Sequence, residues 1–338
     1  MITTSELARL AGVSQSTVSR SLSDHPSISY ETKKRIQALA VQYGYIEQKK
    51  GRRTFYSGEH RVIGILVEDR PFFDDLFINY TIGKVISTAS KKNYYTIRLP
   101  ISSNENGSME RLRDFLKANL IDGFIIMHRV FDDTIHAFLN EMGIPHVYLL
   151  HCSRDSLDAV DMIDTDNYAG GYLGTKHLID HGHRNILTLT CPWREFEDRT
   201  NGYLQALTDA GIKPEARFIL KCECSFESAF NATVDSLKLF DRASAIYVQS
   251  DIMATGVISA LRRHGLSIPD DISVVGSDGY DLGAITDPPF DSVAHPLPEL
   301  ASLALDALIE KIGARHPQSP KQIKLRPYVI ERSSVKTL

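Results

Sequence analysis

The sequence predicts a protein of two parts, a small all-α helix-turn-helix domain and a larger α/β core of two doubly wound subdomains with parallel sheets. Length is the first indication, since 338 residues exceed the roughly 250 at which a single hydrophobic core stops growing. Three short amphipathic helices near the N-terminus are the second indication, and a long alternation of apolar runs and amphipathic stretches after Val62 is the third. We expect a helix-turn-helix domain over 1–45, a hinge or linker over 46–61 and a core over 62–338.

The first domain is expected to hold three helices within residues 3–45. The first helix begins near Thr4 or Ser5, whose hydroxyls can cap free backbone N–H groups, and ends at Gly12. A turn of about three residues leads to a second helix capped by Ser14, the arrangement of a helix-turn-helix motif. A third helix completes the domain.

The second helix carries the candidate DNA contacts. Val18 and Leu22 are four residues apart and point toward the first helix, so Ser16 and Arg20 lie on the opposite face. Gln and Arg match the edges of adenine and guanine, and short hydroxyl side chains suit phosphates. A solvated surface helix rich in serine by accident is the alternative. The candidate DNA contacts are Ser14, Gln15, Ser16, Thr17, Ser19 and Arg20.

Charge separates the two ends of the chain. Residues 1–61 carry ten Lys or Arg against five Asp or Glu, a net +5, which leaves −9 for the remainder of a chain with net charge −4. A basic head on an acidic body indicates a polyanionic partner for the head alone. No apolar run is long enough to span a bilayer and the first twenty residues lack a signal pattern, so we expect a cytoplasmic protein.

The body reads as strands alternating with helices, in two sets that divide near Asp164. This βαβ repetition predicts parallel sheets. The expected strands are RVIGILVED, YYTIRLP, DGFIIMH, PHVYLL, NILTLT, RFILKCE, AIYVQS and ISVVGSD, and the expected helices cover 76–93, 110–119, 132–142, 168–181, 200–210, 226–240 and 252–264.

Polar and aromatic side chains follow several of these strands, where ligands of such sheets bind. A cleft between two units, with a Trp for an apolar ring face and with Arg199 and Asp278 for hydroxyls, suits a polyol or sugar. Phe72 and Phe73 could close one wall. Read individually, the two His candidates also suit ordinary loop residues, and the Trp could belong to the core. The candidate effector contacts are Phe73, His128, His151, Trp193, Arg199, Ser250 and Asp278.

No motif indicates an enzyme. No G-x-G-x-x-G follows a strand, AGGYLG falls within an expected helix, and the sequence contains no Walker, G-x-S-x-G or H-E-x-x-H motif. Four cysteines fit neither a disulfide framework nor a C-x-x-C spacing, and are expected to be structural thiols. We therefore expect no catalytic residues, no metal and no cofactor. The cysteines are Cys152, Cys191, Cys222 and Cys224.

The head resembles a known family along its whole length. TTSELARLAGVSQSTVSRSLSDHPSISYETKKRIQALAVQYGY is similar to the DNA-binding domain of the lactose/galactose repressor (LacI/GalR) family, above all in A-G-V-S-x-x-T-V-S-R. The resemblance implies that Gln15, Ser16 and Arg20 read bases of operator DNA.

The linker, IEQKKGRRTFYSGEHR, carries five of the ten head cations and by itself reads as a basic, flexible segment. In the family that it resembles, this segment forms a hinge helix on operator DNA, and an apolar residue, usually Leu, wedges into the minor groove. The sequence departs from that pattern, because Glu47 stands near the usual Pro, Gly51 falls inside the helix and Thr54 is close to the Leu position.

Two aromatic residues of the linker could replace that wedge. Phe55 or Tyr56 could enter the minor groove, with Arg52 as the accompanying cation. The resemblance thus adds Arg52 and Phe55 to the candidate DNA contacts.

The body resembles the effector-binding core of the same family, which is similar to periplasmic sugar-binding proteins. The matching stretches are DTDNYAGGYLGTKHLIDHGHRNI, DRTNGYLQAL, SDIMATG and IPDDISVVGSDGYD. On this match Arg199 and Asp278 correspond to effector contacts, Ser250 stands where Asn is frequent, and Ser277 replaces a common Phe.

The family's chain crosses between its two subdomains three times. The resemblance implies crossings near Met162, Val293 and Ile323. The N-subdomain would then comprise about 62–161 and 293–322, and the C-subdomain about 162–292 and 323–338.

These observations predict a sequence-specific transcriptional regulator, expected to be a repressor. A homodimer would present two heads to a pseudo-palindromic operator in double-stranded DNA, and a small molecule in the cleft, foremost a sugar, would change the affinity for DNA. A cytoplasmic sugar-binding protein without a gene-regulatory role is the alternative. Sugar acids, sugar phosphates and nucleobases stay open as effectors, as does the choice between inducer and co-repressor. The tail ERSSVKTL has no heptad pattern, which favours a dimer over a tetramer.

Overall fold

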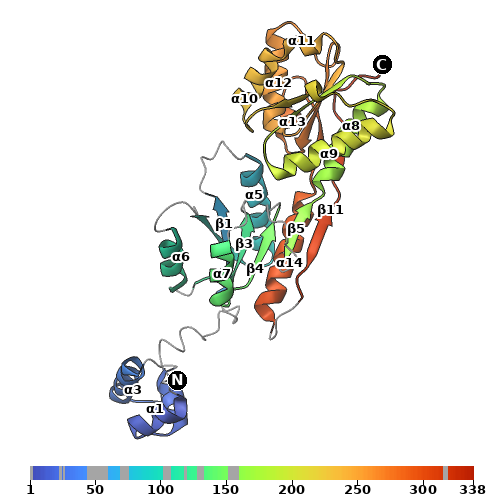
Figure 1. The fold of residues 1–338 in the computed structure, drawn as a ribbon. Coiled ribbons are helices and arrows are strands. Elements are labelled where there is room, and N and C mark those ends of the chain that lie inside the picture. Colours follow the sequence, from blue (N-terminus) through green and yellow to red (C-terminus); the bar gives the residue numbers. More distant parts are fainter. Residues whose placement is uncertain are drawn as a thin grey trace. The chain divides into compact units, whose positions relative to one another are not determined.

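The computed structural model describes residues 3–22, 25, 27–43, 60–68, 76–101, 108–117, 120–127, 133–150, 160–314 and 319–338. The chain divides into two compact units, Met1–Phe55 and Tyr56–Leu338 (Figure 1). Among the described residues, no helix is both long and apolar enough to cross a membrane. Each unit has a hydrophobic core of its own, which confirms the predicted fold class of a small helical domain and an α/β core.

The first unit consists of α1 (Thr4–Ala11), α2 (Gln15–Leu22) and α3 (Tyr30–Gln42). Val18 is fully buried and Leu22 packs against the same core, as the four-residue spacing predicted. All three helices contribute to this small core, which consists of Leu7, Ala8, Ala11, Val18, Ile36 and Ala40.

The N-cap of α1 is Thr3 rather than Thr4 or Ser5. Thr3 Oγ1 accepts the Glu6 backbone N–H at 3.2 Å, and the Thr3 backbone N–H donates to Glu6 Oε2 at 2.7 Å, which completes a capping box. The second bond lowers the pKa of Glu6. Gly12 ends the helix in the left-handed conformation with φ of 63°, where a side chain would be strained.

The first subdomain of the core is a six-stranded parallel sheet of order β11-β5-β4-β3-β1-β2. α5 and α14 pack against the same hydrophobic core on this sheet. Its elements are β1 (Val62–Glu68), α5 (Leu76–Lys91), β2 (Tyr95–Ile101), α6 (Ser108–Lys117), β3 (Gly123–Met127), α7 (Asp133–Glu141), β4 (His146–Leu149), β5 (Met162–Thr165), α14 (Leu297–Gly313) and β11 (Gln322–Leu325).

The second subdomain is a six-stranded sheet of order β12-β10-β9-β8-β6-β7. It is parallel except at β12, which pairs antiparallel with β10. Its elements are α8 (Asn167–Asp180), β6 (Ile186–Thr190), α9 (Arg194–Asp209), η2 (Ala216–Phe218), β7 (Ile219–Lys221), α10 (Phe226–Asp235), α11 (Leu237–Phe240), β8 (Ala245–Val248), α12 (Asp251–Arg263), β9 (Ser273–Asp278), α13 (Leu282–Ile285), β10 (Asp291–Ala294) and β12 (Tyr328–Ile330).

The chain passes between the two subdomains three times, from β5 to α8, from β10 to α14 and from β11 to β12. β5 and β11 pair with each other in the first sheet. The first and third crossings therefore follow Thr165 and Leu325, a few residues later than the boundaries near Met162 and Ile323 that the sequence suggested. The second crossing follows Ala294.

Three helices differ from the sequence prediction. α9 begins at Arg194 instead of Thr200, and the helix expected over 226–240 is interrupted at Ser236, which separates α10 from α11. α14 was not assigned from the sequence, although the apolar residues of LPELASLALDALIEKIG recur at helical spacing opposite the exposed Glu299, Asp306 and Glu310. Its apolar side packs against α5, β3, β4 and β5.

Glycines let α8 and α9 pack backbone to backbone. A Cβ atom on Gly171 would lie 1.8 Å from the carbonyl oxygen of Arg199, and one on Gly202 would lie 2.1 Å from that of Tyr168. No side chain fits at such distances, so these two glycines set how closely Arg199 approaches the start of α8.

We expect Gly171→Ala to destabilise the protein by about 3 kcal/mol, because the backbones of α8 and α9 must separate. Gly83 in α5 is the matched control, since among the described residues no atom beyond the neighbouring backbone of its own helix lies within 4 Å of the position of its Cβ. Gly83→Ala should stabilise the protein by up to about 1 kcal/mol through helix propensity. Urea unfolding of both variants measures the difference, and equal effects would contradict the close packing of α8 and α9.

Candidate functional site

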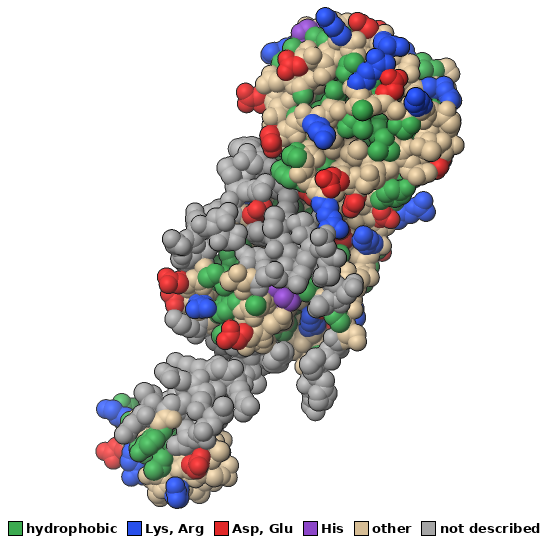
Figure 2. Space-filling view, viewed as in Figure 1, with side chains coloured by type: hydrophobic (Ala, Val, Ile, Leu, Met, Phe, Trp, Pro, Cys, Tyr) green, Lys and Arg blue, Asp and Glu red, His purple; other side chains and the backbone are tan. Residues whose placement is uncertain are grey.

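The helix-turn-helix unit, at the lower left of Figure 2, carries the candidate DNA-reading surface on the exposed side of α2. Ser14 caps the helix as predicted, since its Oγ accepts the Thr17 backbone N–H at 3.1 Å. Gln15 Nε2 donates to Thr4 Oγ1 at 2.9 Å, which holds the amide at the start of the helix. Thr17 is half-buried, and the exposed side chains are those of Ser14, Gln15, Ser16, Ser19 and Arg20.

A cleft of about 620 Å³, part of it open to solvent, lies in the core. Both subdomains contribute to its wall, and polar residues of the wall follow the carboxyl ends of β8 and β9, where the sequence placed the effector. The first subdomain supplies Leu76, Phe77, Ile78, Leu150, Asp164 and Thr165, and the second supplies Asn167, Glu195, Phe196, Arg199, Cys224, Ser250, Ile252, Asp278 and Tyr280.

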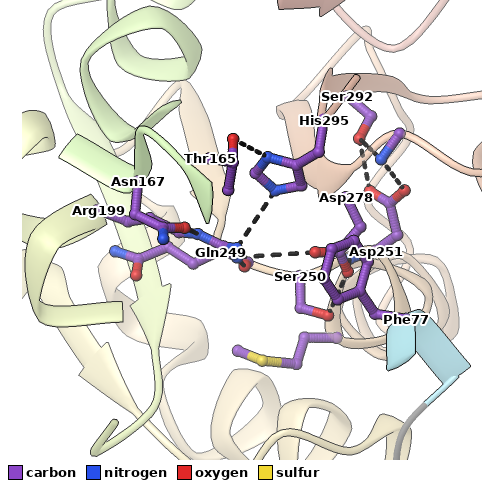
Figure 3. Close-up of polar contacts among 12 residues, drawn as sticks. Phe77, Thr165, Asn167, Arg199, Gln249, Ser250, Asp251, Asp278, Ser292 and His295 are labelled. Carbon is purple, nitrogen blue, oxygen red and sulfur yellow. Dashed lines mark hydrogen bonds and ion pairs between the residues drawn. The ribbon is translucent and has the colours of Figure 1, made fainter. Parts of the chain in front are cut away.

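Arg199 of α9 is the central cation of this cleft, although only 4% of its surface is exposed. Its Nε donates to Asn167 Oδ1 at 3.0 Å and its Nη1 to the Gln249 carbonyl oxygen (Figure 3). Nη1 also lies 3.7 Å from Asp278 Oδ1, and Nη2 lies 3.3 Å from His295 Nε2. The guanidinium is thus held in one orientation before any ligand arrives.

Asp278, the last residue of β9, provides the opposite charge. Its Oδ2 accepts the Ser250 hydroxyl at 2.9 Å and the Asp251 backbone N–H at 3.1 Å. The carboxylate therefore caps the N-terminus of α12, where the helix dipole favours a negative charge. Its backbone has a φ of 129°, a conformation that L-residues rarely adopt and that often occurs at functional sites.

Asp251, the first residue of α12, is a second buried carboxyl behind Asp278. It accepts the Ser292 hydroxyl at 2.7 Å and the Gly279 backbone N–H at 2.9 Å. Burial and the nearby Asp278 carboxylate raise the pKa of Asp251 to about 8. Two neighbouring buried carboxyls do not both ionise easily. Asp251 and Asp278 together therefore present one negative charge to Arg199.

The structure brings together three of the predicted effector contacts, Arg199, Ser250 and Asp278. Trp193 instead stands at the start of α9, half-buried, with its ring 5.6 Å from that of Phe196 and against the core of the second subdomain. The other predicted residues lie outside the described part of the chain, namely the effector candidates Phe73, His128 and His151 and the DNA-binding candidates Arg52 and Phe55.

Several residues near the cleft were missed by the sequence reading, among them Phe77, Thr165, Asn167 and His295. Asn167 belongs to the DTDNY stretch that carries the family resemblance, which was a usable signal. Phe77 reads as an ordinary apolar helix residue. His295 and Thr165 are joined by a hydrogen bond between positions 130 residues apart, which no local pattern reveals.

Within the described residues, the cysteines and the other metal-ligating side chains form no metal site and no disulfide. Cys191, Cys222 and Cys224 are free thiols, and Cys191 is buried with its thiol toward Met253 Sδ. No group of three or more His, Cys, Asp or Glu in the described ranges has the geometry to hold a metal ion. Cys152 lies outside those ranges.

The chemistry of the cleft is that of binding. Aromatic rings of Phe77 and Phe196 offer apolar faces, and Asp278 and Asn167 offer hydrogen-bonding groups at the same cavity. This combination suits a small molecule with hydroxyl groups on an apolar ring frame.

Two family models match the chain. The model described as bacterial regulatory proteins, lacI family, matches residues 3–48, and the model of a periplasmic binding protein-like domain matches residues 175–335. The first covers the helix-turn-helix unit, and the second covers most of the second subdomain together with α14 and the C-terminal strands.

Curated relatives match over nearly the full length. The HTH-type transcriptional repressor PurR of Vibrio atlanticus (strain LGP32) is 29% identical over 344 residues, covering 100% of both chains. The HTH-type transcriptional repressor CytR of Escherichia coli (strain K12) is 27% identical over 327 residues, covering 95% of this chain and 93% of CytR.

Solved structures agree with these matches. The transcriptional regulator CelR in complex with cellobiose has a TM-score of 0.72 at 25% identity, covering 99% of this chain and 100% of that chain. A LacI family regulator from Enterococcus faecium with bound ribose has a TM-score of 0.69 at 25% identity, covering 82% and 99%. The lac repressor dimer bound to operator and the anti-inducer ONPF has a TM-score of 0.67 at 22% identity, covering 99% of each chain, which shows a shared fold.

We expect Asp251→Asn to stabilise the protein increasingly as the pH rises from 5 to 9. The folded protein keeps the Asp251 proton up to a pKa of about 8, whereas the unfolded carboxyl loses it near pH 4. Stability attributable to Asp251 therefore falls as the pH rises between these values. The melting temperature of the variant should exceed that of the wild type by at least about 2 °C at pH 9 and by little at pH 5.

The exposed Asp270 provides the matched control for this experiment. The difference in melting temperature between variant and wild type should rise more from pH 5 to pH 9 for Asp251→Asn than for Asp270→Asn. An equal change in both variants would mean that Asp251 of the folded protein is ionised over this pH range.

Proposed function

Because the chain belongs to the LacI family of bacterial regulatory proteins, we propose that it represses transcription from operator DNA under the control of a small molecule bound in the cleft. The observation that carries the proposal is the presence, in one chain, of an exposed recognition helix and of a cleft with a pre-oriented Arg199 and Asp278 pair. A sugar-binding protein without a gene-regulatory role would need the cleft but not the helix.

On the DNA side, α2 enters the major groove with Gln15, Ser16 and Arg20 toward base edges. Ser14, Thr17 and Ser19 serve the phosphates, although the Ser14 and Thr17 hydroxyls also bond to each other at 2.8 Å. The operator is pseudo-palindromic because a homodimer presents two copies of α2. In the linker, Arg52 and Phe55 take the minor-groove roles.

On the effector side, a sugar or sugar derivative binds with its hydroxyls to Arg199, Asp278 and Ser250. Phe73, His128 and His151 complete our proposed set of contacts, whereas Trp193 is left out because it packs against the core of the second subdomain. Cellobiose and ribose in the two similar regulators support a sugar. Ligand binding shifts the balance between two arrangements of the core by its difference in affinity for them. The protein acts in the cytoplasm, on the nucleoid when bound to its operator.

DNA recognition is tested by selecting bound sequences from random duplexes and measuring affinity against salt. Specific binding should weaken steeply as salt rises, with a slope of log K against log salt of about −0.9 per neutralised phosphate. Arg20→Ala should cost about 1–3 kcal/mol on the selected site and relax the preference at one base pair.

Lys34, exposed on α3, supplies the control for Arg20. Lys34→Ala should weaken binding to selected and random DNA by the same factor, as expected for a phosphate contact. Failure of the wild type to enrich any sequence would refute the regulatory role and leave the sugar-binding alternative.

Effector binding is tested by thermal shift with D-ribose, cellobiose, gluconate, glucose 6-phosphate and hypoxanthine. A ligand at 100 times its dissociation constant adds about 2.7 kcal/mol of stability. Arg199→Ala should abolish both this shift and the ligand's effect on DNA affinity. The separate helix-turn-helix unit should keep its basal affinity for DNA.

Removal of Arg199 also leaves Asp278 buried without its cation, which costs about 3–5 kcal/mol of stability. The comparison is therefore made below the melting temperature of the variant. Arg217, which pairs with Glu215 at the surface, is the control, and Arg217→Ala should keep the ligand response. Equal loss of the response in both variants would contradict the assigned site.

A further inference from the structure

A chain of hydrogen bonds leads from the cleft into the segments that join the two subdomains (Figure 3). Arg199 Nη2 lies 3.3 Å from His295 Nε2, and His295 Nδ1 lies 2.9 Å from Thr165 Oγ1. Thr165 Oγ1 is in turn 3.5 Å from the carbonyl oxygen of Leu325, the longest and weakest contact of the series. We call these four residues the hinge chain.

Only one arrangement of protons satisfies the hinge chain. A guanidinium has donors and no acceptor, so His295 Nε2 accepts from Arg199 and carries no proton. The Nδ1–H of the neutral ring then donates to Thr165 Oγ1, whose own hydroxyl donates to Leu325. Burial and the Arg199 charge hold the pKa of His295 well below its usual range, which keeps the ring in this neutral form.

The hinge chain touches all three crossings. Thr165 is the last residue of β5, immediately before the first crossing, and Leu325 is the last residue of β11, immediately before the third. His295 follows β10 at the second crossing. These positions are far apart in sequence, and the His295 side chain connects them in space.

His295 also contacts both walls of the cleft. On the side of the second subdomain it accepts from Arg199, and on the side of the first its ring meets that of Phe77 edge to face, with centroids 5.4 Å apart at 66°. Phe77 and Arg199 both line the cleft. A ligand that moves either side chain therefore changes the surroundings of His295.

We propose that His295, as a neutral ring protonated at Nδ1, is the positioning residue that couples Arg199 in the cleft to the three crossings. This inference rests on the proposed function in so far as Arg199 contacts the effector. When a ligand draws the Arg199 guanidinium toward itself, His295 Nε2 loses the hydrogen bond that it accepts from Arg199. The hydrogen bond from His295 Nδ1 to Thr165 Oγ1 then changes as well. The two subdomains then favour a different relative position, which is a coupling between cleft and hinge.

Hydrogen exchange of the full-length protein, without DNA or ligand, tests the hinge chain directly. Peptides covering residues 160–168, 291–298 and 320–328 report on the three crossings. His295→Leu removes both hydrogen bonds of the ring, so exchange should become about five- to tenfold faster in all three peptides. Thr165→Val removes the middle hydroxyl and should accelerate the first and third peptides.

His295→Gln is the conservative control. Its amide offers one acceptor for Arg199 and one donor for Thr165 on the same planar group, so exchange at all three crossings should stay within about twofold of the wild type. A His295 that only filled space would be replaced better by Leu than by Gln, so the order of the two variants separates the two roles.

Two results would overturn the inference. Acceleration confined to residues 291–298 in His295→Leu would show that the ring acts only on its own segment. Equal acceleration in His295→Gln and His295→Leu would show that its donor and acceptor do not matter. If His295→Leu fails to fold, Thr165→Val and His295→Gln decide, since they are expected to differ at residues 320–328.

A second measurement addresses regulation with D-ribose and cellobiose as probes. For a sugar that shifts the melting temperature of the wild type, His295→Leu should still bind the sugar but bring the ratio of DNA affinities with and without it close to 1. An unchanged ratio would overturn the inference. If neither sugar binds the wild type, D-ribose and cellobiose are excluded as effectors, and the exchange experiment alone judges the hinge chain.

Discussion

The buried guanidinium of Arg199 is the constraint on which the core depends. Removing a cation from water costs several kcal/mol unless its donors are matched, and here each partner comes from a different segment. Asn167 opens α8, Gln249 follows β8, Asp278 ends β9 and His295 stands at the second crossing. One charge thereby fixes four segments against one another, and the glycine contacts of α8 with α9 set the distance at which this is possible.

The surroundings of this cation also explain how a binding site can be ready before its ligand arrives. Asp278 is held by Ser250 and by the N-terminus of α12, while the raised pKa of Asp251 keeps a second negative charge away. Pre-orientation of this kind lowers the entropy lost on binding. Arg199 is also connected to the three crossings through His295. The cleft and the crossings between the subdomains therefore share one network of hydrogen bonds.

Sequence and structure agree best where an element is local. The caps at Ser14 and Gly12, the buried Val18, and the apolar strands of both sheets follow from residue spacing, and they confirm the predicted fold class. Prediction was weakest where pairing is distant. β5 and β11 form strands because they pair with each other across the chain. α14 was missed for no such reason, because its exposed Glu299, Asp306 and Glu310 lie on one face at helical spacing.

The sequence by itself determined that a basic helix-turn-helix head precedes a double α/β core, because periodicity, caps and charge are properties of neighbouring residues. It also indicated Arg199, Ser250 and Asp278, which the structure brings to one cleft. Only the tertiary structure decided that Trp193 packs against the core of the second subdomain, and that His295 contacts both Arg199 and Phe77. His295 forms hydrogen bonds with Arg199, 96 positions away, and with Thr165, 130 positions away. These contacts form only when the two sheets and the three crossings fold around the buried charge, and no pattern of neighbouring residues predicts them.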